Sequence, residues 1–297
     1  MAFNWQTFKT RTLTATVFVV VMLAGLVFNK WTFLILFSVI HFGCWVEYQK
    51  IVARIDPGYQ KINWVHKYGI MITGWSLILL FSNDSYYIYG LRLKEIGKWM
   101  GLFCFVTIIG VDLLTSKNKE LKNIGHSFFG LLYISLSWGL MMDLYKQIDI
   151  HVHDTRFVLA LDVIPFLIIL SIWINDTMAY IVGSFMGKTP LTIISPQKTW
   201  EGTIGGIILC VAAMAFLYPL IIFKKADLHF AFFTAIIAAI ASIAGTFGDI
   251  LESKLKRMAN VKDSGHIMPG HGGFLDRFDS MLLAIPAVWL FVYFFMK

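Results

Sequence analysis

The sequence predicts an all-α protein that crosses a membrane several times. Hydrophobic residues make up 58% of the chain and charged residues only 14%, and the mean hydropathy is +0.70. These values lie outside the usual range of soluble domains. A spanning helix needs about 20 mainly apolar residues. Nine runs approach or exceed that length: 12–29, 31–49, 68–83, 96–115, 124–145, 157–186, 202–223, 228–250 and 279–296.

The flanks of these runs predict the orientation of the chain. The first run follows Lys9 and Arg11, is long and lacks a small-residue cleavage site, so we interpret it as a span and not as a signal peptide. With the N-terminus in the cytoplasm, the inner loops hold most of the Lys and Arg residues, as the positive-inside rule requires. About nine spans then put the C-terminus outside. The sixth run, 157–186, is longer than a bilayer needs and should tilt, protrude or break near Pro165.

Charge and cysteine content exclude other classes of protein. The net charge is +7, but the cations are spread over loops that need them for topology, so we expect no nucleic-acid partner. Cys44, Cys104 and Cys210 lie inside apolar runs without paired spacing. They indicate packing, not a disulfide or a zinc site.

Acidic residues inside predicted spans are costly unless they meet a polar cavity or a partner. Glu47 and Asp112 lie near cytoplasmic ends, where we expect them to snorkel or to pair with Lys50 or a loop lysine. Asp162 has no evident partner in the sequence.

Two later spans carry polar faces. Asp176, Tyr180 and Ser184 recur every four residues, so a helix would aim them together into a cleft or into an ordinary helix contact. Asp249 begins a second face that runs out of the membrane. The members of this second face are Asp249, Glu252, Ser253, Lys256 and Arg257. A Glu252–Lys256 pair accounts for part of this face, but not for the deeper Asp249.

The loop "GKTPLTIISPQKTWEGTIGG", residues 187–206, is an anion site in outline. Ser195 followed by Pro196 predicts an N-cap and a first helical residue, whose free N–H groups would face the cytoplasm between Lys188 and Lys198. The glycines at 202, 205 and 206 also suit close helix packing.

A charged segment precedes the last span. "PGHGG", residues 269–273, can wrap a phosphate, because glycine adopts backbone conformations that other residues avoid. Asp276 and Asp279 follow. On the predicted cytoplasmic face from Lys188 onward, cations and acids are nearly equal in number. This balance favours the binding of a polyphosphate that carries Mg²⁺ over that of a bare polyphosphate. His266 and His271 do not indicate zinc, since no cysteine accompanies them and the neighbouring acids are hard ligands.

Three segments together resemble a known family. "SKLKRMANVKDSGHIMPGHGGFLDRFDS", residues 253–280, is similar to the signature of the phosphatidate cytidylyltransferases, and "GDILES" leads into it. "DTMAYIVGSFMGK" and "SPQKTWEG" resemble that family's upstream blocks in order and spacing. Together they cover about residues 171–280. Met268 replaces a usual Leu, Ile or Phe, and Gln197 removes a common second lysine before Lys198.

The resemblance implies transfer of CMP from CTP to phosphatidate, giving CDP-diacylglycerol and pyrophosphate. It also implies Mg²⁺, with a second cation such as K⁺ left open, a homodimer, and a bacterial cytoplasmic membrane with the active site facing the cytoplasm. We expect an N-terminal helical bundle over 1–150 and a catalytic region over 151–297, with cytoplasmic loops 187–202 and 251–278.

We assign roles to site residues on this hypothesis. Asp249 and Asp276 would bind the metal, supported by Asp279 and Asp176. The phosphates would meet Lys198, Lys256, Arg257, Lys262 and Arg277. Ser195, Thr199 and the backbone of Gly272 and Gly273 would add hydrogen bonds. Lys188 and Ser253 are assigned to substrate binding. Tyr180, Glu201, Asp263 and His271 are placed in the site without a defined role.

Two alternatives stay open. A CTP-dependent polyprenol or lipid kinase would use similar residues but transfer the terminal phosphate. A secondary transporter would also place charges in its spans, but should show inverted repeats, whereas the charge here is concentrated at one face of the C-terminal half.

Overall fold

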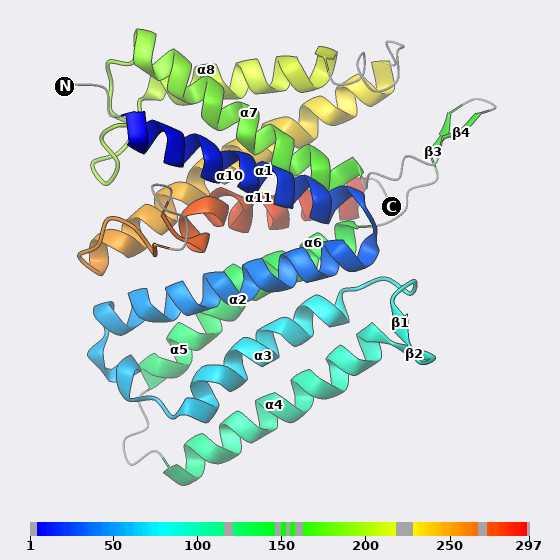
Figure 1. Ribbon diagram of the computed structural model, residues 1–297, viewed down its shortest axis with the longest axis vertical. Helices are drawn as coiled ribbons and strands as arrows, with labels where there is room; N and C mark the ends of the chain where they lie inside the picture. Colours follow the sequence, from blue (N-terminus) through cyan, green and yellow to red (C-terminus); the bar gives the residue numbers. More distant parts are fainter. Residues whose placement is uncertain are drawn as a thin grey trace. The chain divides into compact units, whose positions relative to one another are not determined.

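The computed structural model describes residues 5–115, 121–145, 150–152, 155–157, 163–217, 228–266 and 272–295. These residues are nearly all helical (Figure 1), with two short antiparallel hairpins, so the predicted all-α class is confirmed. In the part of the chain that the structure describes, each predicted run overlaps a helix or consecutive helical segments, and Phe157 of the sixth run lies in a strand. Within the described ranges, five helices are long and apolar enough to cross a membrane by length and composition. A multi-pass membrane protein is thereby supported, while nine spans remain a prediction.

The chain forms two compact units and passes between them more than once. Unit 1 comprises Met1–Asp162 and Met258–Phe278, and unit 2 comprises Val163–Arg257 and Asp279–Lys297. The predicted boundary at residue 150 lies close to the first passage. The prediction did not anticipate that the segment after residue 257 returns to unit 1.

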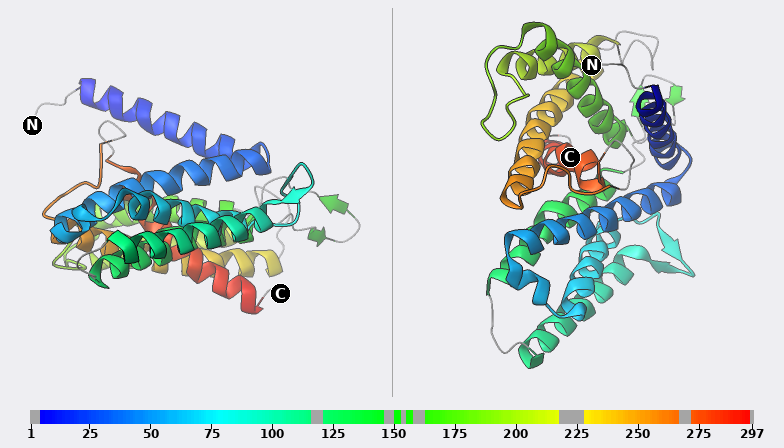
Figure 2. Two further views of the ribbon diagram at one scale, coloured as in Figure 1. Left: turned by 90° about the horizontal axis from the view of Figure 1, so that it is seen from below. Right: turned by 60° about the vertical axis from the view of Figure 1, so that its left-hand side comes forward.

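Unit 1 is a helical bundle with two small hairpins at loop positions. The elements of unit 1 are α1 (Trp5–Val27), α2 (Lys30–Ile55), the 3-10 turn η1 (Pro57–Lys61), α3 (Trp64–Leu80), β1 (Tyr87–Ile88), β2 (Leu91–Arg92), α4 (Leu93–Thr115), α5 (Leu121–Gly130), the π-helical turn η2 (Leu131–Ser135), α6 (Leu136–Leu144), β3 (Ile150–Val152) and β4 (Thr155–Phe157). The β1–β2 hairpin joins α3 to α4, which lie side by side (Figures 1 and 2).

Capping residues set where the helices of unit 1 begin. Asn29 accepts hydrogen bonds from the N–H groups of Trp31 and Thr32, and the Thr32 hydroxyl accepts from the Asn29 N–H, so α2 starts with a reciprocal capping pair. Asn63 caps α3 by accepting a hydrogen bond from the Val65 N–H, without a reciprocal bond. These side chains satisfy N–H groups that the first helical turn leaves open.

A buried polar network ties four elements of unit 1 together. His66 contacts Asp112 at 2.5 Å through Nδ1 and Ser127 at 2.8 Å through Nε2, and Tyr59 reaches the same Ser127 hydroxyl at 3.3 Å. Burial raises the pKa of Tyr59, so its hydroxyl remains a donor at neutral pH. The sequence of contacts from Asp112 through His66 to Ser127 resembles the catalytic triad of a hydrolase. Ser127 is only 3% exposed, however, and a nucleophile must be accessible to its substrate, so we exclude that role. The network therefore joins η1, α3, α4 and α5.

This network gives Asp112 a partner that the sequence did not predict. The carboxylate pairs with His66 across two helices, and the loop lysines at 117 and 119 lie outside the described residues. A helix-to-helix partner removes the need to reach the membrane surface.

Unit 2 contains the remaining helices. They are α7 (Val163–Met186), α8 (Trp200–Ala212), the π-helical turn η3 (Ala213–Leu217), α10 (Leu228–Met258, of which Met258 belongs to unit 1) and α11 (Phe274–Phe295, whose first turn belongs to unit 1). The predicted long run 157–186 is helical from Val163, with Pro165 in the first turn, where proline is tolerated. No break is needed.

Glycine packing joins α7 to α8. A Cβ added at Gly202 would lie 2.7 Å from the Ala179 carbonyl and 2.9 Å from the Gly183 Cα, and one at Gly206 would lie 2.7 Å from the Ala179 Cβ. The two backbones can approach this closely only because these positions lack side chains. The predicted packing role of Gly202 and Gly206 is confirmed.

Candidate active site

Unit 2 brings together cations and carboxylates from three segments. Lys198, from the loop before α8, forms an ion pair with Asp249 on α10, and the Ser253 hydroxyl lies 3.3 Å from the other Asp249 oxygen. One turn further on, Lys256 lies 2.5 Å from the fully buried Glu252. The predicted polar face of α10 is real, and the distant loop around Lys198 reaches it as expected.

Asp279 adds a carboxylate from α11 to this group. Its side chain is 9% exposed and lies within electrostatic range of Asp249, Lys198 and Lys256. A Cβ added at Gly248 would meet the Ser280 Cα at 3.1 Å, so glycine lets α10 approach α11 here. We call Lys198, Asp249, Glu252, Lys256 and Asp279 the charge cluster.

The loop that supplies Lys198 is a small hairpin. The Leu191 N–H donates to the Lys198 carbonyl at 2.7 Å, and the Trp200 N–H donates to the Thr189 carbonyl at 2.9 Å. This pairing holds Lys198 at the base of the hairpin, directly before α8.

The predicted helix start at Ser195 and Pro196 is wrong. The Lys198 N–H donates to the Ser195 carbonyl at 3.1 Å, so these residues form a β-turn, and α8 begins later with Thr199 as its N-cap. Proline at the second position of such a turn has the same φ as at the first position of a helix, so the local sequence suits both. The Thr199 hydroxyl caps the helix in place of the predicted Ser195.

Glu201 anchors the other end of this loop. Its carboxylate accepts hydrogen bonds from the N–H groups of Lys188 and Thr189, both at 3.2 Å. Together with its own N–H, these donors lower the pKa of Glu201 to about 2. The residue thus fixes the loop conformation, and a direct contact with substrate stays a prediction.

Unit 1 contains a second group of acids, which has a different character. Glu47 on α2 is 1% exposed. Its carboxylate accepts hydrogen bonds from the Ser264 hydroxyl at 2.6 Å and from the N–H groups of Phe274 at 3.0 Å and Leu275 at 2.8 Å. The expectation that Glu47 snorkels or pairs with Lys50 is therefore wrong. Its partners lie more than two hundred residues later in the chain.

Asp276 completes this arrangement at the start of α11. Its Oδ2 accepts from the Gly273 N–H at 2.8 Å and from the Ser264 N–H at 2.9 Å, and it also lies 2.9 Å from the Ser264 hydroxyl oxygen, whose one hydrogen it shares with Glu47. Gly272 has φ +83°, a conformation that favours glycine. We call Glu47, Ser264, Gly273 and Asp276 the backbone clamp. Asp276, predicted as a metal ligand, is thus also a helix-capping residue.

The other predicted residues are distributed as follows. Asp176, Tyr180, Lys188, Arg257, Lys262, Asp263 and Arg277 are exposed in the described structure, and His271 lies outside the described residues. On α7, Tyr180 is 77% exposed, whereas Ala179 and Gly183 on another side of the helix pack against α8. The predicted polar face is therefore not covered by α8.

The acids of the charge cluster suit a hard divalent cation in kind. Among the described residues, no group of three or more His, Cys, Asp or Glu side chains is arranged to hold a metal. Mg²⁺ is commonly held by one or two carboxylates together with substrate phosphates, and the carboxylates of Asp249 and Asp279 lie within electrostatic range of each other. The Lys198 ammonium pairs with Asp249 in this structure.

Sequence reasoning missed the role of Glu47, the bond from Ser264 and the burial of Glu252. A signal existed for Glu47, because an ionisable residue inside a span requires a partner. Which partner it finds depends on tertiary folding.

These features define a class: a polytopic helical membrane protein with a mixed-charge site on helix ends and loops. The chain matches the cytidylyltransferase family model over residues 9–295. It belongs to this family.

Curated relatives are similar along most of the chain. A phosphatidate cytidylyltransferase of Staphylococcus saprophyticus is 31% identical over 287 residues, covering 94% of this chain and 96% of the relative. The enzyme of that name from Bacillus subtilis is 31% identical over 224 residues, 73% of this chain and 76% of the relative. One from Thermotoga maritima is 29% identical over 265 residues, 83% and 89% respectively.

Proposed function

We propose that the protein is a phosphatidate cytidylyltransferase, which transfers CMP from CTP to phosphatidate and forms CDP-diacylglycerol and pyrophosphate. The family match and the names of full-length relatives support this assignment. The observation that carries it is the charge cluster, in which Lys198 and Lys256 already pair with carboxylates. Such a group offers cations to phosphates and carboxylates to a metal.

In the proposed reaction, a phosphate oxygen of phosphatidate attacks the α-phosphorus of CTP. A new P–O bond forms, the bond from the α-phosphorus to the bridging oxygen breaks, and pyrophosphate leaves with the electron pair. A phosphate monoester has its second pKa near about 6 and is largely dianionic at pH 7. The nucleophile therefore needs positioning and charge neutralisation more than a general base.

Lys198 and Lys256 act in this proposal by exchanging a carboxylate for a phosphate. Each ammonium is held by an acid in the described structure, so its position is set before substrate arrives. Arg257, Lys262 and Arg277 are exposed and supply further charge in the proposed site. We keep Ser195, Gly272 and Tyr180 as proposed substrate contacts.

Mg²⁺ is part of the proposal. Bound Mg²⁺ would neutralise charge on the pyrophosphate leaving group. Asp249 and Asp279 would hold it, and Asp276 and Asp176 complete the predicted ligand set. A second cation such as K⁺ is kept within the same proposal.

The finer topology is also proposed. We infer nine spans, a cytoplasmic N-terminus, an outer C-terminus and an active site on the cytoplasmic side of a bacterial cytoplasmic membrane, on the basis of the positive-inside rule. Reporter fusions at Lys61 and at Lys297 should report opposite sides. A shared side would overturn the odd span number.

A homodimer is proposed on family resemblance alone. Native mass spectrometry in detergent should give twice the mass of one chain. A monomer that retains full specific activity would contradict it.

The central experiment uses purified protein, phosphatidate, Mg²⁺ and CTP labelled on the α-phosphate. Label should enter the lipid fraction, while γ-labelled CTP should release its label as pyrophosphate. Transfer of the γ-label to a lipid would support the kinase alternative instead. Absence of both transfers, with a working control enzyme, would overturn the proposed function and leave the transporter reading.

A further inference from the structure

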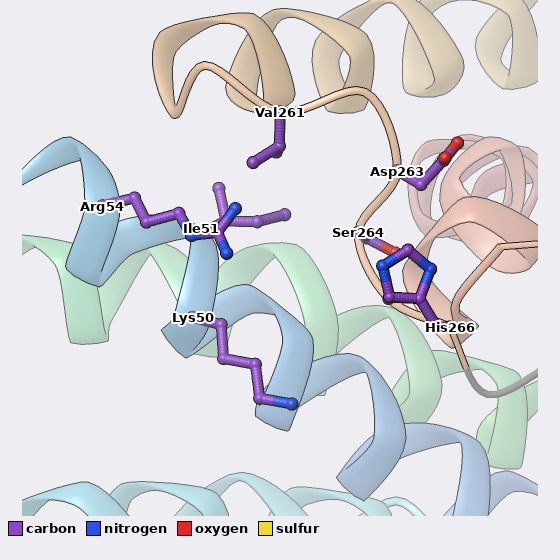
Figure 3. A pocket seen from close by; sticks show the side chains of 8 residues that line it. Lys50, Ile51, Arg54, Val261, Asp263, Ser264 and His266 are labelled. Atoms are coloured by element: carbon purple, nitrogen blue, oxygen red, sulfur yellow. The ribbon is translucent and has the colours of Figure 1, made fainter.

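A cavity in unit 1 lies beside the backbone clamp but outside the charge cluster. It has a volume of about 360 Å³ and lies between α2 and the segment that follows α10 (Figure 3). Its walls are formed by Lys50, Ile51, Arg54, Val261, Asp263, Ser264, Gly265 and His266. None of the residues contributed by α2 belongs to the family signature in the sequence.

One face of α2 supplies both an anchor and two cations. Glu47, Lys50 and Arg54 lie at i, i+3 and i+7 and therefore share a side of the helix. Lys50 and Arg54 are both exposed, and like charges four residues apart repel each other modestly. The C-terminal dipole of the helix and membrane topology would each favour cations here. Neither of these effects accounts for a cavity with a second wall opposite the cations.

That second wall is held in one position. Ser264 is buried and bonds to both Glu47 and Asp276. A Cβ at Gly265 would collide with the Glu47 carboxylate, so the chain passes against α2 with backbone alone. Because its own hydrogen bonds already fix this wall, a ligand that binds does not have to pay the entropy cost of ordering it, and affinity is higher as a result.

The charges in the cavity favour an anion. In Figure 3 the Asp263 carboxylate points away from the cavity and from the two cations, whereas the His266 ring lies on the side facing them. Lysine offers three rotatable donors and arginine a planar fork, and both match phosphate oxygens. The volume lies at the small end of the range for ligand pockets, about 300–1,000 Å³. It suits a phosphate-bearing group and not a whole lipid.

We propose that this pocket binds a phosphate group of a substrate, with Lys50 and Arg54 as its charged contacts and His266 as a hydrogen-bonding contact. The proposal rests on the proposed function, because CTP and phosphatidate are the phosphate compounds it supplies. Phosphate is the chemistry they share. The lipid headgroup and the nucleotide triphosphate are distinguished by experiment.

The test compares the two Michaelis constants in mixed micelles. We expect Lys50→Gln and Arg54→Gln each to raise the KM of one substrate about tenfold, as for loss of one charge-assisted hydrogen bond, with kcat changed less than about threefold. Lys50→Arg and Arg54→Lys should restore most of the affinity. Lys61→Gln is the matched control, because Lys61 is an exposed cation on the following 3-10 turn and lies outside the pocket. It should leave both constants within about twofold.

The outcomes show which substrate supplies the bound phosphate and whether the pocket binds phosphate at all. A higher KM for phosphatidate assigns the pocket to the lipid phosphate, and a higher KM for CTP assigns it to the nucleotide. Constants no different from those of Lys61→Gln overturn the proposal. The proposal is also overturned if the rise in KM disappears when phosphatidylglycerol replaces the neutral carrier lipid, since that result indicates general attraction to an anionic surface.

Failure of the proposed function is recognised separately. If the wild-type protein transfers no CMP, the pocket can still be tested by equilibrium binding. One measurement uses CTP, and the other compares nanodiscs that contain phosphatidate with nanodiscs of phosphatidylcholine alone. Weaker binding by Lys50→Gln and Arg54→Gln would support it. Binding equal to wild type would overturn it as well.

Discussion

The backbone clamp of unit 1 and the charge cluster of unit 2 neutralise their acids in different ways. In unit 1, Glu47 and Asp276 accept hydrogen bonds from backbone N–H groups and from Ser264. In unit 2, Asp249 and Glu252 pair with lysine side chains. Backbone donors cannot leave without unfolding a segment, whereas a lysine can exchange one anion for another. The backbone clamp therefore holds the chain, and the charge cluster is the part suited to binding and chemistry.

The largest effect should come from the charge cluster. We expect Asp249→Asn to lower CMP transfer about 100-fold or more, because Lys198 loses its partner and the proposed metal loses a ligand. Labelled CTP measures the transfer, and the thermal midpoint should change little. Asp84→Asn is the matched control, since Asp84 is an exposed acid that pairs with Lys94 and Arg92. Near-normal activity of Asp249→Asn would remove the residue from the site and weaken the contrast.

The backbone clamp should respond in stability. Glu47→Ala leaves the N–H groups of Phe274 and Leu275 and the Ser264 hydroxyl without their acceptor, which we expect to cost about 3 kcal/mol or more. Thermal unfolding in detergent measures the loss. Glu47→Gln keeps an acceptor oxygen and should cost less. An unchanged midpoint for Glu47→Ala would show that the clamp does not hold the chain.

A smaller effect should appear at the glycine beside Glu47. Gly273→Ala places a Cβ against the Glu47 carboxylate, and we expect about 1–3 kcal/mol of destabilisation. The same change in a Glu47→Ala background should cost less, because the obstacle is gone. Gly110→Ala is the control, since a Cβ at Gly110 meets nothing within 4 Å. Additive costs in the double variant would contradict the contact.

The smallest effect concerns pH. Hydrogen bonds from backbone N–H groups lower the pKa of Glu201 to about 2. A carboxyl group whose pKa is lowered in the folded protein stabilises the fold at pH values above its ordinary pKa of about 4.3. This stabilisation is lost as the pH falls toward the pKa of the folded state. Glu201→Gln should therefore lower the thermal midpoint slightly at pH 7, and the difference should shrink as pH falls from about 5 toward 2. A constant difference across that range would exclude the carboxylate as its cause.

How well a feature could be predicted from the sequence depends on how far apart along the chain its interacting residues lie. Helical runs follow from local hydropathy, and the face of α10 follows from spacing, so both were predicted correctly. Lys198 and Asp249 were assigned to one predicted site, with phosphate and metal as their ligands, but the ion pair between them was not predicted. The Glu47 partners were not predicted, because their separation of 217 and 228 residues leaves no local pattern. The Ser195 turn was misassigned because proline suits two local structures.

Glu47 also has a consequence for the order of synthesis. The residue emerges from the ribosome 217 residues before Ser264, which at about 5–20 residues per second is a delay of about 10–40 s. During that interval an acid inside a membrane helix awaits its donors. Assembly of unit 1 must therefore finish after most of unit 2 has been made, so the N-terminal bundle matures late despite being translated first.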